Sequence, residues 1–120
     1  MVKAASPHSF LPLKTDTLLI LLALASGSMH GYGIIRDVEE RSEGEVQLQT
    51  GALYRTLRRL LNDALIEEDL AAVDDSPDER RRYYQLTRLG REVMDAEVLR
   101  MSRLVRASKL IHAGKRPKLV

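Results

Sequence analysis

The sequence predicts a mainly α-helical fold with one small antiparallel β-hairpin and a long C-terminal helix. Three observations support this fold class. Apolar residues follow helical spacing in three segments before residue 63, alternate as in strands over two short segments, and return to helical spacing after residue 87. A length of 120 residues, with 44% hydrophobic and 30% charged residues, suits one domain with one hydrophobic core.

The composition excludes several classes of site. The chain has no cysteine, which excludes a disulfide framework, a thiolate metal site and a cysteine nucleophile. Its three histidines, His8, His30 and His112, lie far apart in the sequence, so we expect neither a metal site nor a cofactor. The apolar run at 17–25 is shorter than the ~20 residues of a membrane span and lacks the flanks of a signal peptide. We therefore expect a cytoplasmic protein without membrane contact.

The N-terminal segment is expected to hold an arm and the first helix. Residues 1–13 show no periodicity and contain two prolines, which predicts a mobile or loosely docked arm. The helix is expected to be capped by Thr15 or Asp16 and to stop at Gly27. Its centre is apolar all round, which predicts burial on most sides, in part by a partner subunit. The residues expected to contribute to that subunit contact are Leu18 and Leu22.

A second helix is predicted from about Gly31 to about Gly44, with its apolar residues on one face. The third helix is the most informative segment of the chain. We expect Thr50 to be its N-cap, with Gly51 in its first turn. At about 100° per residue, one face carries Leu53, Leu57, Leu60 and Leu61, and the opposite face carries Arg55, Arg58, Arg59 and Asn62, with Tyr54 on the border.

A β-hairpin is predicted next, from strands at 65–70 and 82–86 that are joined by the turn-rich stretch 74–78. The net charge of +2 is unevenly spread around it. Residues 62–79 include eight acidic and no basic side chains, whereas basic residues outnumber acidic ones twelve to three in 80–120. Such asymmetry permits a basic binding surface on a nearly neutral chain.

The final helix is predicted at 88–113, with Thr87 as its cap and a basic tail at 114–120. It is longer than a three-helix core requires, and Glu97 and Ser108 interrupt its apolar stripe of roughly heptad spacing. A lone helix would leave this stripe in water, so we expect a partner helix and a homodimer. The stripe consists of Met94, Val98, Met101, Leu104, Val105 and Ile111.

Helix, helix, helix, hairpin and helix is the order of a winged helix-turn-helix, predicted here at 14–87, whose third helix enters the major groove of DNA. Residues 18–92 also resemble the PadR family of bacterial transcriptional regulators, and the small subfamily with a single C-terminal dimerisation helix fits best. The motifs that carry the resemblance are Met-His-Gly-Tyr-Gly-Ile at 29–34, Gly-Ala-Leu-Tyr-Arg-Thr-Leu at 51–57, Leu-Ile-Glu at 65–67, and Arg-Tyr-Tyr-Gln-Leu-Thr at 82–87 followed by Gly90.

The resemblance implies a dimeric repressor that binds an inverted-repeat operator and is often relieved by a small molecule. Its dimer contact would come from the C-terminal helix, with help from the N-terminal one. The chain departs from the family pattern at Ala64, where glycine is usual, at Ala52, where threonine is common, and at Arg55, where many members have proline.

The residues expected to contact DNA are Thr50, Gly51, Tyr54, Arg55, Arg58 and Arg59 on the third helix, and Arg80, Arg81 and Arg82 on the wing. Guanidinium groups match both phosphates and base edges. Plainer interpretations stay open: a solvated arginine face, a Thr50 that only caps, a Tyr54 at the core edge, and wing arginines paired with the acidic residues of 74–79. His30 and Tyr32 are assigned to packing at the helix start.

Two other functions are alternatives to DNA binding. A winged helix can serve protein–protein contact, with its third helix on an acidic partner. An enzyme is the weaker alternative, because the sequence contains no nucleophile–base pair, metal cluster or phosphate loop.

Overall fold

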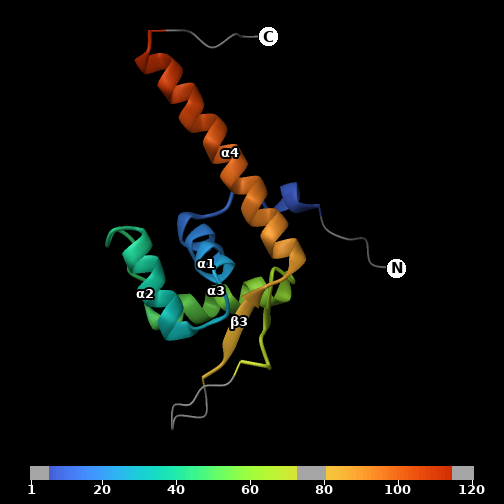
Figure 1. Cartoon of the computed structure of the whole chain (residues 1–120). Coiled ribbons are helices and arrows are strands. Elements are labelled where there is room, and N and C mark those ends of the chain that lie inside the picture. Colours follow the sequence, from blue (N-terminus) through green and yellow to red (C-terminus); the bar gives the residue numbers. More distant parts are fainter. Residues whose placement is uncertain (1–5, 73–80, 115–120) are drawn as a thin grey trace.

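The structure, a computed structural model, describes residues 6–72 and 81–114. It confirms the predicted fold class: a mainly helical chain with a small antiparallel sheet and a long C-terminal helix (Figure 1). In chain order the elements are η1 (Pro7–Phe10), α1 (Thr15–Ala25), β1 (Met29–His30), α2 (Gly31–Arg41), α3 (Thr50–Asn62), β2 (Ile66–Glu68), β3 (Tyr83–Leu86) and α4 (Arg88–His112). No helix in these described ranges has both the length and the apolar character that crossing a membrane would require.

Helix α1 forms the centre of the core. Residues 17–21, Ala23 and Leu24 are buried, and α1 contacts α2, α4 and β3. The predicted burial on most sides is therefore correct, and most of the cover comes from the same chain. The predicted cap is wrong: Lys14 is the N-cap, without a side-chain hydrogen bond, and both Thr15 and Asp16 lie inside the first turn.

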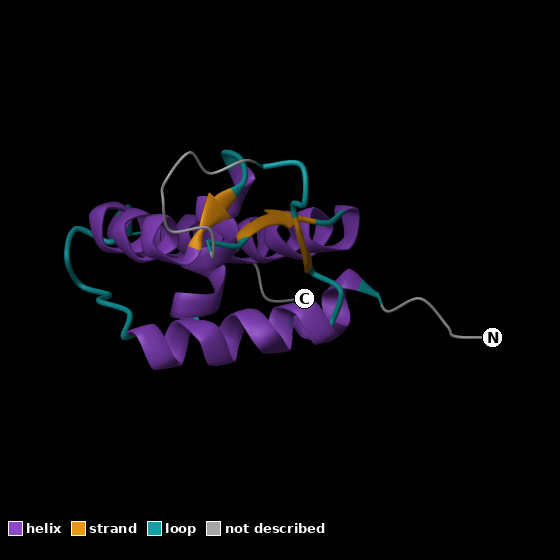
Figure 2. Cartoon of the chain, turned by 90° about the horizontal axis from the view of Figure 1, so that it is seen from below, coloured by secondary structure: helices purple, strands orange, loops and turns teal. Residues whose placement is uncertain are grey.

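The sheet has three antiparallel strands in the order β1-β3-β2, grouped beside the helices (Figure 2). Met29 of β1 and Glu68 of β2 both pair with Tyr84, so Tyr84 lies on the central strand. The hairpin was predicted, but β1 was not, because a strand of two residues is too short to show alternation. The strands are also shorter than predicted, and the turn at 74–78 lies outside the described residues.

Helices α2 and α3 end with a non-glycine residue in the left-handed conformation. Ala64 has φ +59° after α3, and Glu43 has φ +54° after α2. The N–H of Leu65 donates to the carbonyl of Leu60 at 3.0 Å, which closes α3 in a Schellman motif. This geometry explains why the family pattern favours glycine at position 64.

Helix α4 begins in direct contact with the end of α3. Thr87 is its N-cap, as predicted, and the Thr87 side chain accepts a 3.0 Å hydrogen bond from the N–H of Gly90. The Thr87 hydroxyl donates to the carbonyl of Ala64 at 2.6 Å. A β-carbon on Gly90 would lie 1.9 Å from the carbonyl oxygen of Leu65, so only glycine allows this approach.

The N-terminal arm is docked on α4. Element η1 contacts α4, and Phe10, Leu11 and Leu13 pack against the core. The N–H of Leu13 donates to the carboxylate of Glu97 at 2.6 Å. Residues 6–13 are therefore held in place, where the sequence predicted a mobile or loosely docked arm; residues 1–5 lie outside the described ranges.

Glu97 is the buried carboxylate that fixes the arm. Its side chain is 0% exposed and accepts a 2.5 Å hydrogen bond from Arg100 as well as the one from Leu13. The Arg100 hydrogen bond is the main cause that lowers the pKa of Glu97, against the opposing effect of burial. The charge that interrupts the apolar stripe therefore connects the arm to α4.

Candidate nucleic-acid interface

The outer face of α3 carries an exposed ridge of Gly51, Arg55, Arg58 and Asn62. These positions recur at the spacing of one helix face. The opposite face buries Leu53, Leu57 and Leu60 in the core. Burial of the leucines turns the ridge towards water, as the sequence predicted.

The guanidinium groups of Arg55 and Arg58 are available to a ligand. Within residues 6–72 and 81–114, neither forms a hydrogen bond or ion pair. Nη1 of Arg55 lies 3.5 Å from the position of a β-carbon on Gly51, an ordinary van der Waals distance, so Arg55 extends along the helix past Gly51. The pair presents donors that fit phosphate oxygens and guanine edges.

Arg59 is arranged differently from the other two arginines of α3. Its Nη2 donates to the hydroxyl of Thr17 at 3.0 Å, and Thr17 is only 3% exposed. Arg59 therefore connects α3 to α1. The structure groups Arg55 with Arg58 and directs the Arg59 guanidinium to the protein's own core.

Thr50 does not cap α3. The N-cap is Gln49, again without a side-chain hydrogen bond, and Thr50 is the exposed first residue of the helix. The predicted capping role is therefore wrong by one position.

The wing contributes two described arginines, and both lie near other side chains. Nη1 of Arg82 is 3.3 Å from the carboxylate of Glu68. Nη1 of Arg81 is 3.5 Å from Nε2 of His30. Both residues are exposed. Arg80 and the acidic residues at 74–79 lie outside the described residues.

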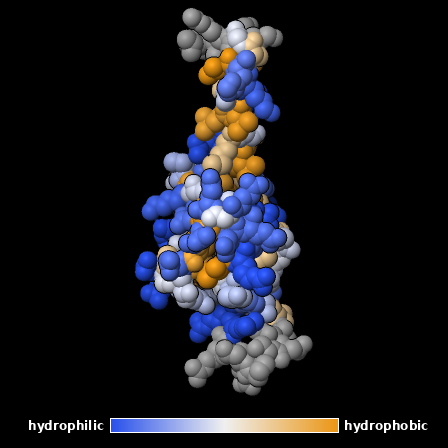
Figure 3. Space-filling view, turned by 90° about the vertical axis from the view of Figure 1, so that its left-hand side faces the viewer, coloured by the Kyte–Doolittle hydropathy of each residue, from blue (hydrophilic) through white to orange (hydrophobic). Residues whose placement is uncertain are grey.

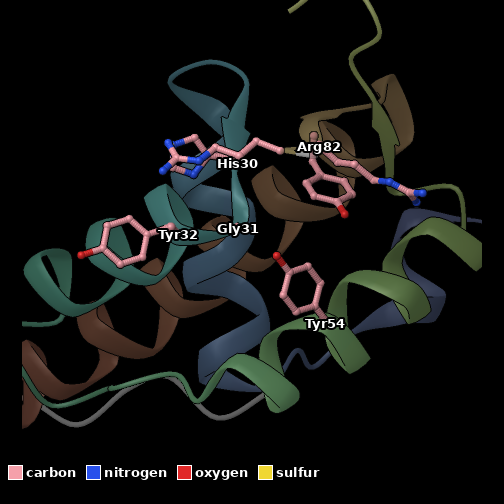
Figure 4. A pocket seen from close by; sticks show the side chains of 7 residues that line it. His30, Gly31, Tyr32, Tyr54 and Arg82 are labelled. Carbon is pink, nitrogen blue, oxygen red and sulfur yellow. The ribbon is translucent and has the colours of Figure 1, made fainter. Parts of the chain in front are cut away.

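Between the wing and the first turns of α2 and α3 lies a hollow of about 430 Å³, which we call the tyrosine pocket (Figure 4). Tyr54, 47% exposed, directs its hydroxyl at the start of α2, whereas Tyr32 points away. His30 caps α2, since its Nδ1 accepts the N–H of Gly33 at 3.0 Å, which agrees with its predicted packing role. The lining residues are His30, Gly31, Tyr32, Tyr54, Arg81, Arg82 and Tyr84.

The sequence predicted DNA contact for Tyr54, Arg81 and Arg82 of this lining and packing for His30 and Tyr32, whereas no role was predicted for Tyr84. Two of the motifs that carry the family resemblance, at 29–34 and 82–87, supply most of the lining. Their shared tyrosines were the available signal, but only the folded sheet brings them together.

The residues expected at a subunit contact fall into two groups. Leu18 and Met94 are buried within the single chain, and Leu22 is partly buried there. The others lie on the half of α4 that projects beyond the body, where apolar groups form an exposed stripe (Figure 3). This exposed group is Val98, Met101, Leu104, Val105 and Ile111. Leu99 and Leu110 are also exposed apolar residues of α4, outside the predicted stripe.

Comparison with known proteins identifies relatives that match most of the chain. The family model described as Transcriptional regulator PadR-like family matches residues 20–96. A 37.1 kDa uncharacterised protein in transposon TN4556 of Streptomyces fradiae is 36% identical over 87 residues, which cover 72% of this chain and 23% of that protein. The chain thus spans about a quarter of that relative's length.

Two solved structures have a similar fold. A PadR family transcription regulator from Clostridium difficile R20291 is 25% identical, with a TM-score of 0.60, over 83% of this chain and 97% of that one. Bacillus subtilis PadR in complex with operator DNA is 22% identical, with a TM-score of 0.57, over 70% of this chain and 47% of that one. At 22% identity the second similarity concerns the fold alone.

Proposed function

This chain belongs to the PadR-like family of transcriptional regulators, and from that membership we propose that it is a homodimeric repressor that binds duplex DNA at an inverted-repeat operator. Members of this family are regulators, not enzymes. The proposal assigns DNA binding to residues 14–87 and dimerisation to 88–113. It also places the protein in the cytoplasm, where chromosomal DNA is accessible.

The observation that carries the proposal is the exposed pair Arg55 and Arg58 on α3. Both guanidinium groups lack partners among the described residues. Arginine forks bind guanine edges bidentately and also neutralise phosphates, which supplies most of the affinity of DNA-binding proteins. The structure of Bacillus subtilis PadR, which has the same fold, contains operator DNA, and this supports DNA as the ligand of α3.

Dimerisation is proposed through the projecting half of α4. Leu104 is 58% exposed and Ile111 is 67% exposed, whereas the N-terminal half of the same helix is packed against the rest of the chain. A stripe of this kind is typical of a helix–helix interface between subunits. Two copies would present their α3 helices to successive major grooves, with half-sites near one helical turn, ~10 bp, apart.

The test is selection of binding sites from a library of random duplexes with the wild-type protein. We expect an enriched inverted repeat, and we expect Arg55→Ala and Arg58→Ala to weaken binding to it. Arg106→Ala is the matched control, because it removes the same charge from an exposed position on α4. No enriched sequence, or stable binding to an acidic protein partner but not to duplex DNA, would contradict the proposal.

We also propose that a small molecule relieves repression, because the family resemblance implies it. A compound that lowers the affinity of the wild-type protein for the selected duplex, without unfolding the protein, would support this part. A screen against the selected duplex tests it independently of the DNA-binding proposal.

A further inference from the structure

Tyr84 is a buried tyrosine that lines the tyrosine pocket and whose hydroxyl has no hydrogen-bond partner in the part of the chain that the structure describes. The residue is 5% exposed, and no hydrogen bond of its side chain occurs within the described ranges 6–72 and 81–114. Buried polar groups are nearly always hydrogen-bonded, so a ligand or water is expected at this hydroxyl. Burial raises the pKa of Tyr84, so the group stays protonated and able to donate.

The N-terminus of α2 opens into the same pocket. The first N–H groups of a helix have no carbonyl partner in their own helix, and this end carries a partial positive charge. His30 takes the N–H of Gly33. Gly31 lets Tyr54 approach closely, because a β-carbon there would lie 2.8 Å from the Tyr54 hydroxyl. Two tyrosines and the N-terminus of α2 therefore line one hollow.

The pocket is lined by donors, and none of its described lining residues is a carboxylate. Arg81, beside His30, lies at one side, and Arg82, beside Glu68, lies at the other. The tyrosine pocket adjoins the exposed ridge of α3. Tyr54, Tyr84 and Arg82 also line a smaller hollow of about 160 Å³, and Arg58 of the ridge lines this second hollow too. An anion in the pocket would thus lie on the same continuous surface as the arginine ridge.

We propose that the tyrosine pocket holds one backbone phosphate of bound duplex DNA, with the hydroxyls of Tyr54 and Tyr84 as donors beside the start of α2. A phosphodiester accepts hydrogen bonds and carries a single negative charge, which suits a site of neutral donors with arginines at its rim. Such a contact carries no sequence information and fixes the register and height of α3 on the duplex. The inference rests on the proposed function.

The first experiment measures DNA affinity for Tyr84→Phe and Tyr54→Phe on a duplex of about four helical turns, ~40 bp, that carries the selected sequence. Each change removes one hydroxyl donor, so we expect about tenfold weaker binding, with an unchanged salt dependence because no charge is lost. Tyr83→Phe is the matched control: Tyr83 is the neighbouring tyrosine of β3 and does not line the pocket.

Thermal unfolding separates this contact from a structural role. The Tyr84 hydroxyl has no described protein partner, so Tyr84→Phe should unfold no earlier than the wild type. A structural hydroxyl would instead lower the unfolding temperature. A clear loss of stability in Tyr84→Phe overturns the proposal, even where DNA binding also falls.

The second experiment replaces single phosphates of the duplex with neutral methylphosphonates. At one position in each half-site, the replacement should weaken the wild type by about tenfold and weaken Tyr84→Phe by clearly less, because one of the two donor hydroxyls is already missing from that variant. Inorganic phosphate, at matched ionic strength, distinguishes a free-anion site. If phosphate stabilises the wild type but Tyr84→Phe binds DNA normally, the pocket is an anion site that DNA does not use.

The outcomes separate the two proposals. Failure of the wild type to bind any duplex contradicts the proposed function. Normal DNA binding by both tyrosine variants, together with weak binding by Arg55→Ala and Arg58→Ala, leaves the function standing and overturns the phosphate site.

Discussion

The guanidinium of Arg59 donates to the buried hydroxyl of Thr17, 3.0 Å away, and so connects α3 to the central helix. Arg58, the next residue before it, has no partner among the described residues. Two adjacent arginines of one helix therefore have different tasks. One orients α3 against the core, and the other is available to DNA.

The first prediction separates these tasks. Arg58→Ala should weaken binding to the selected duplex by ~1–3 kcal/mol with an unchanged unfolding temperature. Arg59→Ala should lower the free energy of unfolding by about 1 kcal/mol, because it leaves Thr17 without that hydrogen bond. Urea unfolding and gel-shift titration check both. Identical behaviour of the two variants in both assays would contradict the distinction.

The second prediction concerns the contact between α4 and the end of α3. Gly90→Ala should destabilise the fold by about 3 kcal/mol or more, since the new β-carbon would meet the Leu65 carbonyl at 1.9 Å. Gly51→Ala is the matched control, because it lies on the exposed face of α3 and should stabilise that helix by ~0.5–1 kcal/mol. Denaturant unfolding of both variants tests this prediction. A Gly90→Ala protein as stable as the wild type would rule out the close approach of Gly90 to the Leu65 carbonyl.

The third prediction follows from the left-handed conformation after α3. Ala64→Gly should raise the free energy of unfolding by roughly 1 kcal/mol, because glycine adopts φ +59° without steric strain. Ala113→Gly, at the C-cap of α4 with φ −82°, supplies the control and should gain nothing. Equal effects at the two positions would mean that Ala64 is not strained.

The fourth prediction is a pH dependence from Glu97. The Arg100 hydrogen bond lowers the pKa of Glu97 below its ordinary 4.5 in the folded protein. The ionised carboxylate therefore stabilises the fold above about pH 4.5, and this stabilisation is lost as the pH falls through the lowered folded pKa. The stability difference between the wild type and Glu97→Gln should shrink over that range in urea unfolding. Glu92→Gln, whose side chain is exposed, should show no comparable trend, and a gap for Glu97→Gln that stays constant with pH would refute the assignment.

The fifth prediction tests the dimer. Leu104→Glu places a charge in the exposed stripe of α4 and should convert the protein to a monomer in sedimentation or light-scattering measurements. Arg103→Glu changes the neighbouring residue, which lies outside the stripe, and should leave the dimer intact. A wild-type protein that sediments as a monomer at all concentrations would contradict the proposed α4 interface.

The two faces of α3 could be predicted from the sequence because leucines at helical spacing decide which side is buried. The partner of Arg59 could not, since Thr17 is distant in the sequence and only folding brings the two together. Glu97 was interpreted as an interruption of a stripe for the same reason: its partner, the N–H of Leu13, belongs to a segment without any periodic pattern. The tyrosine pocket likewise depends on β1, a strand too short to recognise in the sequence.

Thr87 and Gly90 connect the start of α4 directly to the end of α3. A movement of α4 at the proposed subunit interface is therefore transmitted to the helix that contacts DNA. A helix of 25 residues is roughly 37 Å long. A tilt of about 10° at the interface would displace the other end by about 6 Å, more than the ~3.4 Å between successive base pairs. In the proposed dimer, small changes in how two α4 helices cross would therefore decide whether both reading helices fit one duplex.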